Sequence, residues 1–170
     1  MVTVDHLRLL FTVLRRQFDF CILDISSHLG DATLEVIEES DRLLMITSGR
    51  LPSLKDTKRL LKVMADLGIR ADRISIIWNR MFGVDLRREV IEASIKFPVA
   101  TELPAASEAL LEAITDGVPL VLKDPRSSFA RALKPLAQTI VGDRLPTAEA
   151  AGSARAPMKR LLLARGGATA

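Results

Sequence analysis

The stretch that decides the fold is Phe18-Asp19-Phe20-Cys21-Ile22-Leu23-Asp24-Ile25-Ser26-Ser27. It is short and almost wholly apolar, which is typical of a strand buried on both faces of a parallel sheet. Asp24 comes at its carboxyl end, and ligands bind at that end of the strands in open α/β sheets. In nucleotide hydrolases an aspartate so placed orients Mg²⁺ or its waters, usually downstream of a glycine-rich phosphate loop. The sequence has no G-x-x-x-x-G-K-[ST] loop and no Gly-Lys dipeptide, so it carries only half of such a site.

The composition indicates one globular domain. Hydrophobic residues make up 48% of the 170 residues and charged residues 26%, which allows a real core and argues against overall disorder. The single cysteine, Cys21, excludes an internal disulfide and fits a reducing cytoplasm. Its place in the apolar run predicts a small buried hydrophobe. No apolar run approaches the ~20 residues that a membrane-spanning helix needs.

The net charge of +3 comes from residues 145–170. From Leu145 onward the sequence has the basic residues Arg155, Lys159, Arg160 and Arg165 and the acidic residue Glu149, while residues 1–144 carry as many acidic as basic groups. A body without net charge has no field that favours a polyanion, so we expect no nucleic acid to bind it.

Strands and helices alternate along the sequence. The apolar runs predict strands over residues 42–48, 73–79 and 98–103 and an extended edge piece over 119–123. Helical spacing predicts helices over 4–17, 32–39, 53–67, 85–95, 105–116 and 127–142. Such alternation predicts right-handed crossovers and a doubly wound, mostly parallel α/β sheet. We expect the domain to span residues 1–143 and the Ala-, Gly- and Pro-rich residues 144–170 to form a disordered basic tail.

Two further strand exits supply candidate binding residues besides Asp24. The strand ending in Trp78 continues into Asn79 and Arg80, and an asparagine amide offers the donor and acceptor that can read a purine edge. The strand over residues 98–103 is followed by Pro104 and then by a helix whose N-terminal N–H groups could face a ligand. Each exit is equally explained as an ordinary turn or cap. Because the carboxyl ends of parallel strands meet at one edge, we expect these residues to line one crevice.

Residues 3–143 resemble the C-terminal part of MinD/ParA-type ATPases, and the branch they most resemble is the CpaE/TadZ group, which helps assemble and localise Tad/Flp-type pili. The segments that carry the resemblance, in order, are Phe18–Asp24, Ser40–Thr47, Pro52–Lys55, Ile76–Arg80 and Gly117–Val121.

The resemblance implies a Rossmann-like P-loop NTPase fold, incomplete at its N-terminus, with ATP and Mg²⁺ as cofactors. It gives Asp24 the Walker B role, catalytic and acting on the metal, and Asn79 a contact with adenine, with Arg80 and Pro104 as further nucleotide-binding residues. Members of the family dimerise around ATP and place machinery at a membrane or cell pole. A homodimer and pilus or secretion proteins are therefore the expected partners, in the cytoplasm, at the inner face of the membrane or at a pole.

The sequence departs from the family in two ways. The phosphate loop and its lysine are expected before residue 1, so we predict that this chain does not hydrolyse ATP alone and is a fragment or half of a split domain. The missing strand normally pairs beside the Asp24 strand, and its loss would leave an apolar edge exposed. Ser26 and Ser27 replace the prolines that many members carry after the aspartate.

Three alternatives stay open. One is a non-enzymatic interaction module that has kept the fold and lost the nucleotide, and another is a different MinD/ParA relative, such as a partition or flagellar-number regulator. Residues 157–165 are basic and apolar, which leaves membrane contact open, although a disordered tail fits this short segment better.

Overall fold

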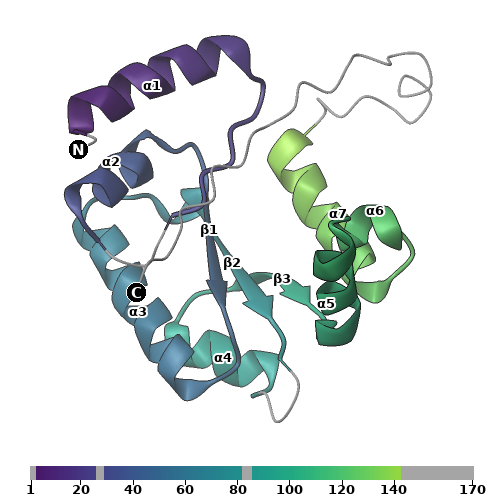
Figure 1. Ribbon diagram of the computed structural model, residues 1–170. Coiled ribbons are helices and arrows are strands. Elements are labelled where there is room, and N and C mark those ends of the chain that lie inside the picture. The colour runs from purple at the N-terminus through teal and green to yellow at the C-terminus, as the bar shows by residue number, and fades with distance from the viewer. Residues whose placement is uncertain (1–2, 26–28, 82–85, 143–170) are drawn as a thin grey trace, which may run out of the picture.

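The computed structural model describes residues 3–25, 29–81 and 86–142 (Figure 1). Its sheet has three parallel strands in the order β1 (Leu43–Thr47), β2 (Ile74–Asn79) and β3 (Val99–Leu103). Helix α3 connects β1 to β2, and α4 connects β2 to β3. All three strands therefore end at the same edge, and the predicted α/β fold with a parallel sheet is confirmed.

All helices except α6 were predicted, in this order. The helices are α1 (Val4–Gln17), α2 (Asp31–Glu39), α3 (Leu51–Asp66), α4 (Arg88–Ile95), α5 (Ser107–Asp116), α6 (Leu120–Lys123) and α7 (Ser128–Val141), with a short 3₁₀ turn at Ala71–Arg73. Thr3 caps α1 in a capping box with His6. Gly68 and Gly117 follow α3 and α5 with φ of 73° and 66°, the left-handed conformation that glycine adopts at the ends of helices.

The core lies between the sheet and helices α3 and α4. Ile76 of β2, Leu54 of α3 and Ile91 of α4 are each at most 1% exposed, and Trp78 is buried with them. Strand β2 lies between β1 and β3, so both of its edges are hydrogen-bonded, and its consecutive residues Ile76 and Ile77, which point to opposite faces of the sheet, are both buried.

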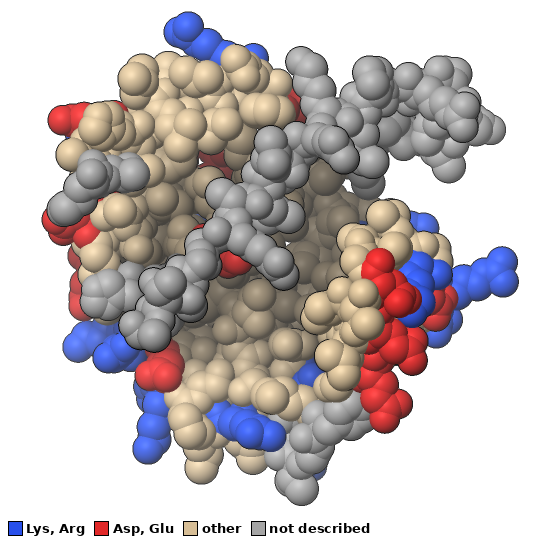
Figure 2. Space-filling view, in the orientation of Figure 1, with Lys and Arg blue, Asp and Glu red and all other residues tan. Residues whose placement is uncertain are grey.

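The other face of the sheet is open along β1. Leu44 and Ile46 point to this face and are 42% and 67% exposed, whereas Ile77, the partner of Ile46 on β2, is 2% exposed. Helix α7 packs against β3, and Figure 1 shows α5, α6 and α7 on one side and α1 and α2 on the other. Figure 2 shows a hollow between the two groups, lined mostly by uncharged residues.

Arginines from α1 and from the 3₁₀ turn before β2 hold α2 in place. Arg8 of α1 forms a two-pronged pair with the buried Glu35 of α2, with distances of 2.6 Å and 3.0 Å. The Arg73 guanidinium, just before β2, donates to the carbonyls of Ile37, Glu38 and Ser40 at the end of α2. A cation at this end satisfies carbonyls that have no partner within the helix.

The predicted buried strand at 18–27 is wrong for its described part. Residues 18–25 have no regular structure, and Phe18, Phe20 and Ile22 are 54%, 43% and 94% exposed. No described strand pairs with the segment, so its backbone lacks ladder partners and its apolar side chains lack a second layer. Cys21 is consequently exposed, which corrects its predicted burial. Ser26 and Ser27 lie outside the described residues.

The extended piece predicted at 119–123 is a helical turn, α6. The N–H groups of Lys123 and Asp124 donate to the carbonyls of Pro119 and Leu120, at 3.0 Å and 2.8 Å. The Lys123 ammonium also pairs with Asp116 of α5 at 2.7 Å. No described strand lies beside this segment to hold it extended, so local hydrogen bonds decide its shape.

Two other expectations bear on the chain's surroundings. In the described part of the chain no helix is both long enough and apolar enough to cross a membrane. The predicted tail, residues 144–170, lies outside the described residues.

Candidate functional site

The carboxyl ends of β2 and β3 leave the sheet side by side. Asn79 is the last residue of β2 and is paired with Leu103, the last residue of β3. The N–H of Arg80 donates to the carbonyl of Leu103 at 2.9 Å, so one further bond extends the ladder beyond the strand. Asn79 and Pro104 are half-buried and Arg80 is exposed. The structure thus brings three of the four predicted site residues to one edge.

Arg80 is held at this edge by two interactions. Its guanidinium lies over the ring of Trp78, 5.4 Å from the centroid, and Nη1 lies 3.3 Å from Oε1 of Glu102 on β3. A cation over an indole face and a carboxylate partner restrict the side chain. The Glu102 partner was not predicted from the sequence; it follows from the pairing of Trp78 with Glu102 across the two strands.

A shallow pocket of about 320 Å³ opens beside these residues. It is lined by Trp78, Arg80, Leu86, Arg87, Arg88, Glu89 and Glu102. Three guanidinium groups against two carboxylates favour an anionic group at this edge. Arg88 also donates to the carbonyl of Val99 and to Glu92, and Arg80 is paired with Glu102, so Arg87 is the cation most available to a ligand.

Strand β1 ends in a hydroxyl network that the sequence analysis did not predict. The Thr57 hydroxyl lies 2.8 Å from both the Thr47 hydroxyl and the Ser53 carbonyl, and the Ser48 N–H donates to the Ser53 hydroxyl at 3.0 Å. Thr47 and Thr57 are buried. The network fixes where β1 turns into α3, at the same edge as Asn79.

Asp24 is not brought to this edge by strand pairing. It is exposed within the irregular segment 18–25 and forms no hydrogen bond or ion pair with Asn79 or Arg80. Within residues 3–25, 29–81 and 86–142, no group of three or more His, Cys, Asp or Glu side chains could hold a metal ion. The metal and catalytic role of Asp24, and the nucleotide contacts of the other three residues, stay predictions.

No family model matches the chain, but individual proteins do. The chain is 22% identical over 152 residues to the septum site-determining protein MinD of Thermotoga maritima, covering 86% of the chain and 55% of that protein. It is 27% identical over 126 residues to an uncharacterized ATP-binding protein of Methanocaldococcus jannaschii, covering 73% and 47%. The chain therefore spans about half the length of the curated relatives that it matches.

Solved structures share its fold. A ParA family ATPase from Chlorobium tepidum superposes with a TM-score of 0.73 at 24% identity, over 80% of this chain and 56% of that one. MinD from Pyrococcus horikoshii, complexed with Mg-ADP, gives 0.68 at 21% identity over 81% and 56%. The MinC:MinD complex of Aquifex aeolicus gives 0.73 at 18% identity over 85% and 62%.

Proposed function

Because the chain has the α/β fold of MinD/ParA-type P-loop ATPases and is similar to them in sequence, we propose that it is the C-terminal part of such an ATPase domain. Within the family we assign it to the CpaE/TadZ-like branch, with a role in pilus assembly or polar localisation, on the segments listed in the sequence analysis. Its ligands are ATP and Mg²⁺. A phosphate loop with its lysine, which this sequence lacks, completes the site.

The observation that carries the proposal is the open apolar face beside β1. Strand β1 is at the edge of the sheet, with Ile46 largely exposed, and the apolar segment 18–25 has no strand partner among the described residues. Soluble proteins rarely leave such surface uncovered. A further strand followed by a helix would pair with the free edge of β1 and cover Ile46, which is the supersecondary unit that carries a phosphate loop.

The same insertion gives the predicted site residues their roles. Asn79, Arg80 and Pro104 already lie at the carboxyl edge, where the base of ATP would bind. A strand that pairs with segment 18–25 as well as with β1 would place Asp24 at that edge, next to the phosphates. There a carboxylate can hold Mg²⁺ or its water ligands. When bound, Mg²⁺ neutralises charge that develops on the phosphates.

A solved relative supports partner proteins in general, while the pilus or secretion partners rest on the sequence resemblance. MinD of Aquifex aeolicus was solved in a complex with MinC, which supports partner proteins on this fold. For this chain we propose a homodimer and pilus or secretion proteins.

The roles are tested in a longer chain that begins upstream and carries a phosphate loop. Asp24→Ala should abolish ATP hydrolysis, because the metal loses its carboxylate. Asn79→Ala should raise the Kd for ATP about ten-fold, since a lost hydrogen bond to the base costs about 1–1.5 kcal/mol. Gln138→Ala removes an exposed amide on α7 and serves as the matched control. ATP turnover by the 170-residue chain alone, or equal effects of Asn79→Ala and Gln138→Ala, would contradict the assignment.

The exposed position of Asp24 favours a second candidate, a protein-interaction module that has kept the fold and lost the nucleotide. In that case no ATP binds to either chain, and substitutions at Asp24 and Asn79 leave partner binding unchanged.

A further inference from the structure

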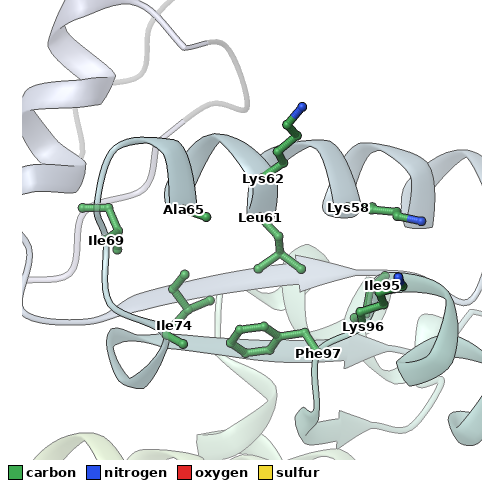
Figure 3. Close-up of a pocket in the computed structure, with 10 residues that line it drawn as sticks. Lys58, Leu61, Lys62, Ala65, Ile69, Ile74, Ile95, Lys96 and Phe97 are labelled. Carbon is green, nitrogen blue, oxygen red and sulfur yellow. The ribbon is translucent and has the colours of Figure 1, made fainter.

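A second hollow lies at the other end of the sheet from Asn79 and Pro104. It is a groove of about 300 Å³ between the C-terminal half of α3, the start of β2 and the connection from α4 to β3 (Figure 3). Its lining is Lys58, Leu61, Lys62, Ala65, Ile69, Ala71, Ile74, Ile95, Lys96 and Phe97. None of these residues belongs to the proposed ATP site.

The floor of the groove is apolar. Ile69, Ile74 and Ile95 are buried, and Leu61 and Phe97 are half-buried above the core. Figure 3 shows Leu61 directed from α3 toward the strands and Phe97 lying below it, while Lys62 extends outward from the helix. The groove therefore offers apolar surface that an inserted side chain would cover.

The rim is basic. Lys58, Lys62 and Lys96 are exposed, the lining contains no carboxylate, and none of the three lysines forms an ion pair with another described residue. Lys96 ends α4 with φ of 56°, a conformation in which glycine is the usual residue. Three ammonium groups around an apolar floor are complementary to an apolar side chain flanked by carboxylates.

We propose that this groove binds an acidic amphipathic helix of a partner protein. Lys58 and Lys62 are four residues apart, so their side chains leave α3 one turn apart. Two carboxylates one turn apart on a partner helix match that spacing, and an apolar side chain between them enters the groove above Leu61 and Phe97. The volume is at the lower limit of small-molecule pockets, which favours a side-chain anchor over a larger ligand.

The test uses the purified chain and a fluorescein-labelled synthetic helical peptide with leucines at i, i+3 and i+7 and glutamates one turn apart beside them. Fluorescence anisotropy at low salt should show saturable binding. Lys58→Glu with Lys62→Glu should weaken it roughly ten-fold or more. Lys55→Glu with Lys134→Glu makes the same charge change at exposed lysines outside the groove and should alter the Kd by less than about two-fold. Circular dichroism checks that both double variants are folded.

The peptide also carries its own controls. Replacement of its leucines by serine, or of its glutamates by glutamine, should each abolish measurable binding, because the anchor and the charges act together. The proposal is overturned if the peptide fails to bind at about 1 mM, or if the two double variants weaken binding equally. It is also overturned if phosphatidylglycerol vesicles bind in a manner that requires Lys58 and Lys62 while the peptide does not.

Discussion

The exposed fractions of two isoleucines, paired across β1 and β2, show that one face of the sheet is open along β1. Ile46 and Ile77 are paired in register and point to the same face, but Ile46 is 67% exposed and Ile77 2% exposed. Full burial of an isoleucine side chain contributes about 1.5–3 kcal/mol. Because Ile46 is only one third buried, Ile46→Ala should lower the free energy of unfolding by only about 0.5–1 kcal/mol. Ile77→Ala also creates a cavity, and we expect it to cost about 2–5 kcal/mol.

The assay is urea unfolding followed by the fluorescence of Trp78, the only tryptophan, which is buried in the core. The two variants should differ by at least about 1 kcal/mol in the free energy of unfolding, with unchanged m-values. In a longer chain that supplies the missing strand and helix, the cost of Ile46→Ala should rise to that of Ile77→Ala. Equal costs in the 170-residue chain would show that the face is already covered and would refute the reasoning.

Three further predictions concern Arg73, Glu92 and Cys21. Arg73→Met should lower the free energy of unfolding by roughly 1.5–3 kcal/mol, measured in urea, because carbonyls at the end of α2 lose a charged donor; Arg70→Met, at an exposed neighbour, should change it little. The pKa of the Glu92 carboxyl is lowered from its usual 4.5, chiefly because the Val99 N–H donates to the carboxylate and also because of Arg88. Glu92 therefore stabilises the folded state above pH 4.5. This stabilisation is lost as the pH falls through the lowered pKa. Glu92→Gln should therefore be less stable at neutral pH, with a difference that shrinks in acid; a gap that stays constant with pH would refute this. Cys21 is exposed, so a maleimide should label it at the rate of a small-molecule thiol, and labelling should slow in the longer chain if segment 18–25 is paired there.

The parallel sheet was predictable because each strand carries its own signal. Apolar runs mark β1, β2 and β3, and Gly68 and Gly117 mark where helices end, so local pattern and tertiary structure agree. The meeting of Asn79, Arg80 and Pro104 at one edge followed from topology alone, since parallel strands end together.

What could not be predicted depends on neighbours. Segment 18–25 has the composition of a buried strand, but a strand exists only with a hydrogen-bonding partner, and sequence pattern does not report whether one is present. Cys21 was misplaced for the same reason. The Glu102 partner of Arg80 and the hydroxyl network around Thr47 depend on register between elements distant in sequence, which periodicity does not contain.

The two hollows lie at opposite ends of the strands. The arginine-rich pocket lies beside the predicted nucleotide residues, whereas the lysine-rimmed groove lies where the strands begin. The two linings share no residue, so the proposed partner helix and the proposed nucleotide would not compete for the same side chains.

The central claim is that this chain supplies one half of an ATP site. Calorimetric titration with Mg-ATP tests it most directly, with the 170-residue chain and with a longer chain that carries a phosphate loop. The account predicts no measurable binding to the 170-residue chain and saturable, Mg²⁺-dependent binding to the longer one. Binding of equal affinity to both chains, or to neither, would contradict it.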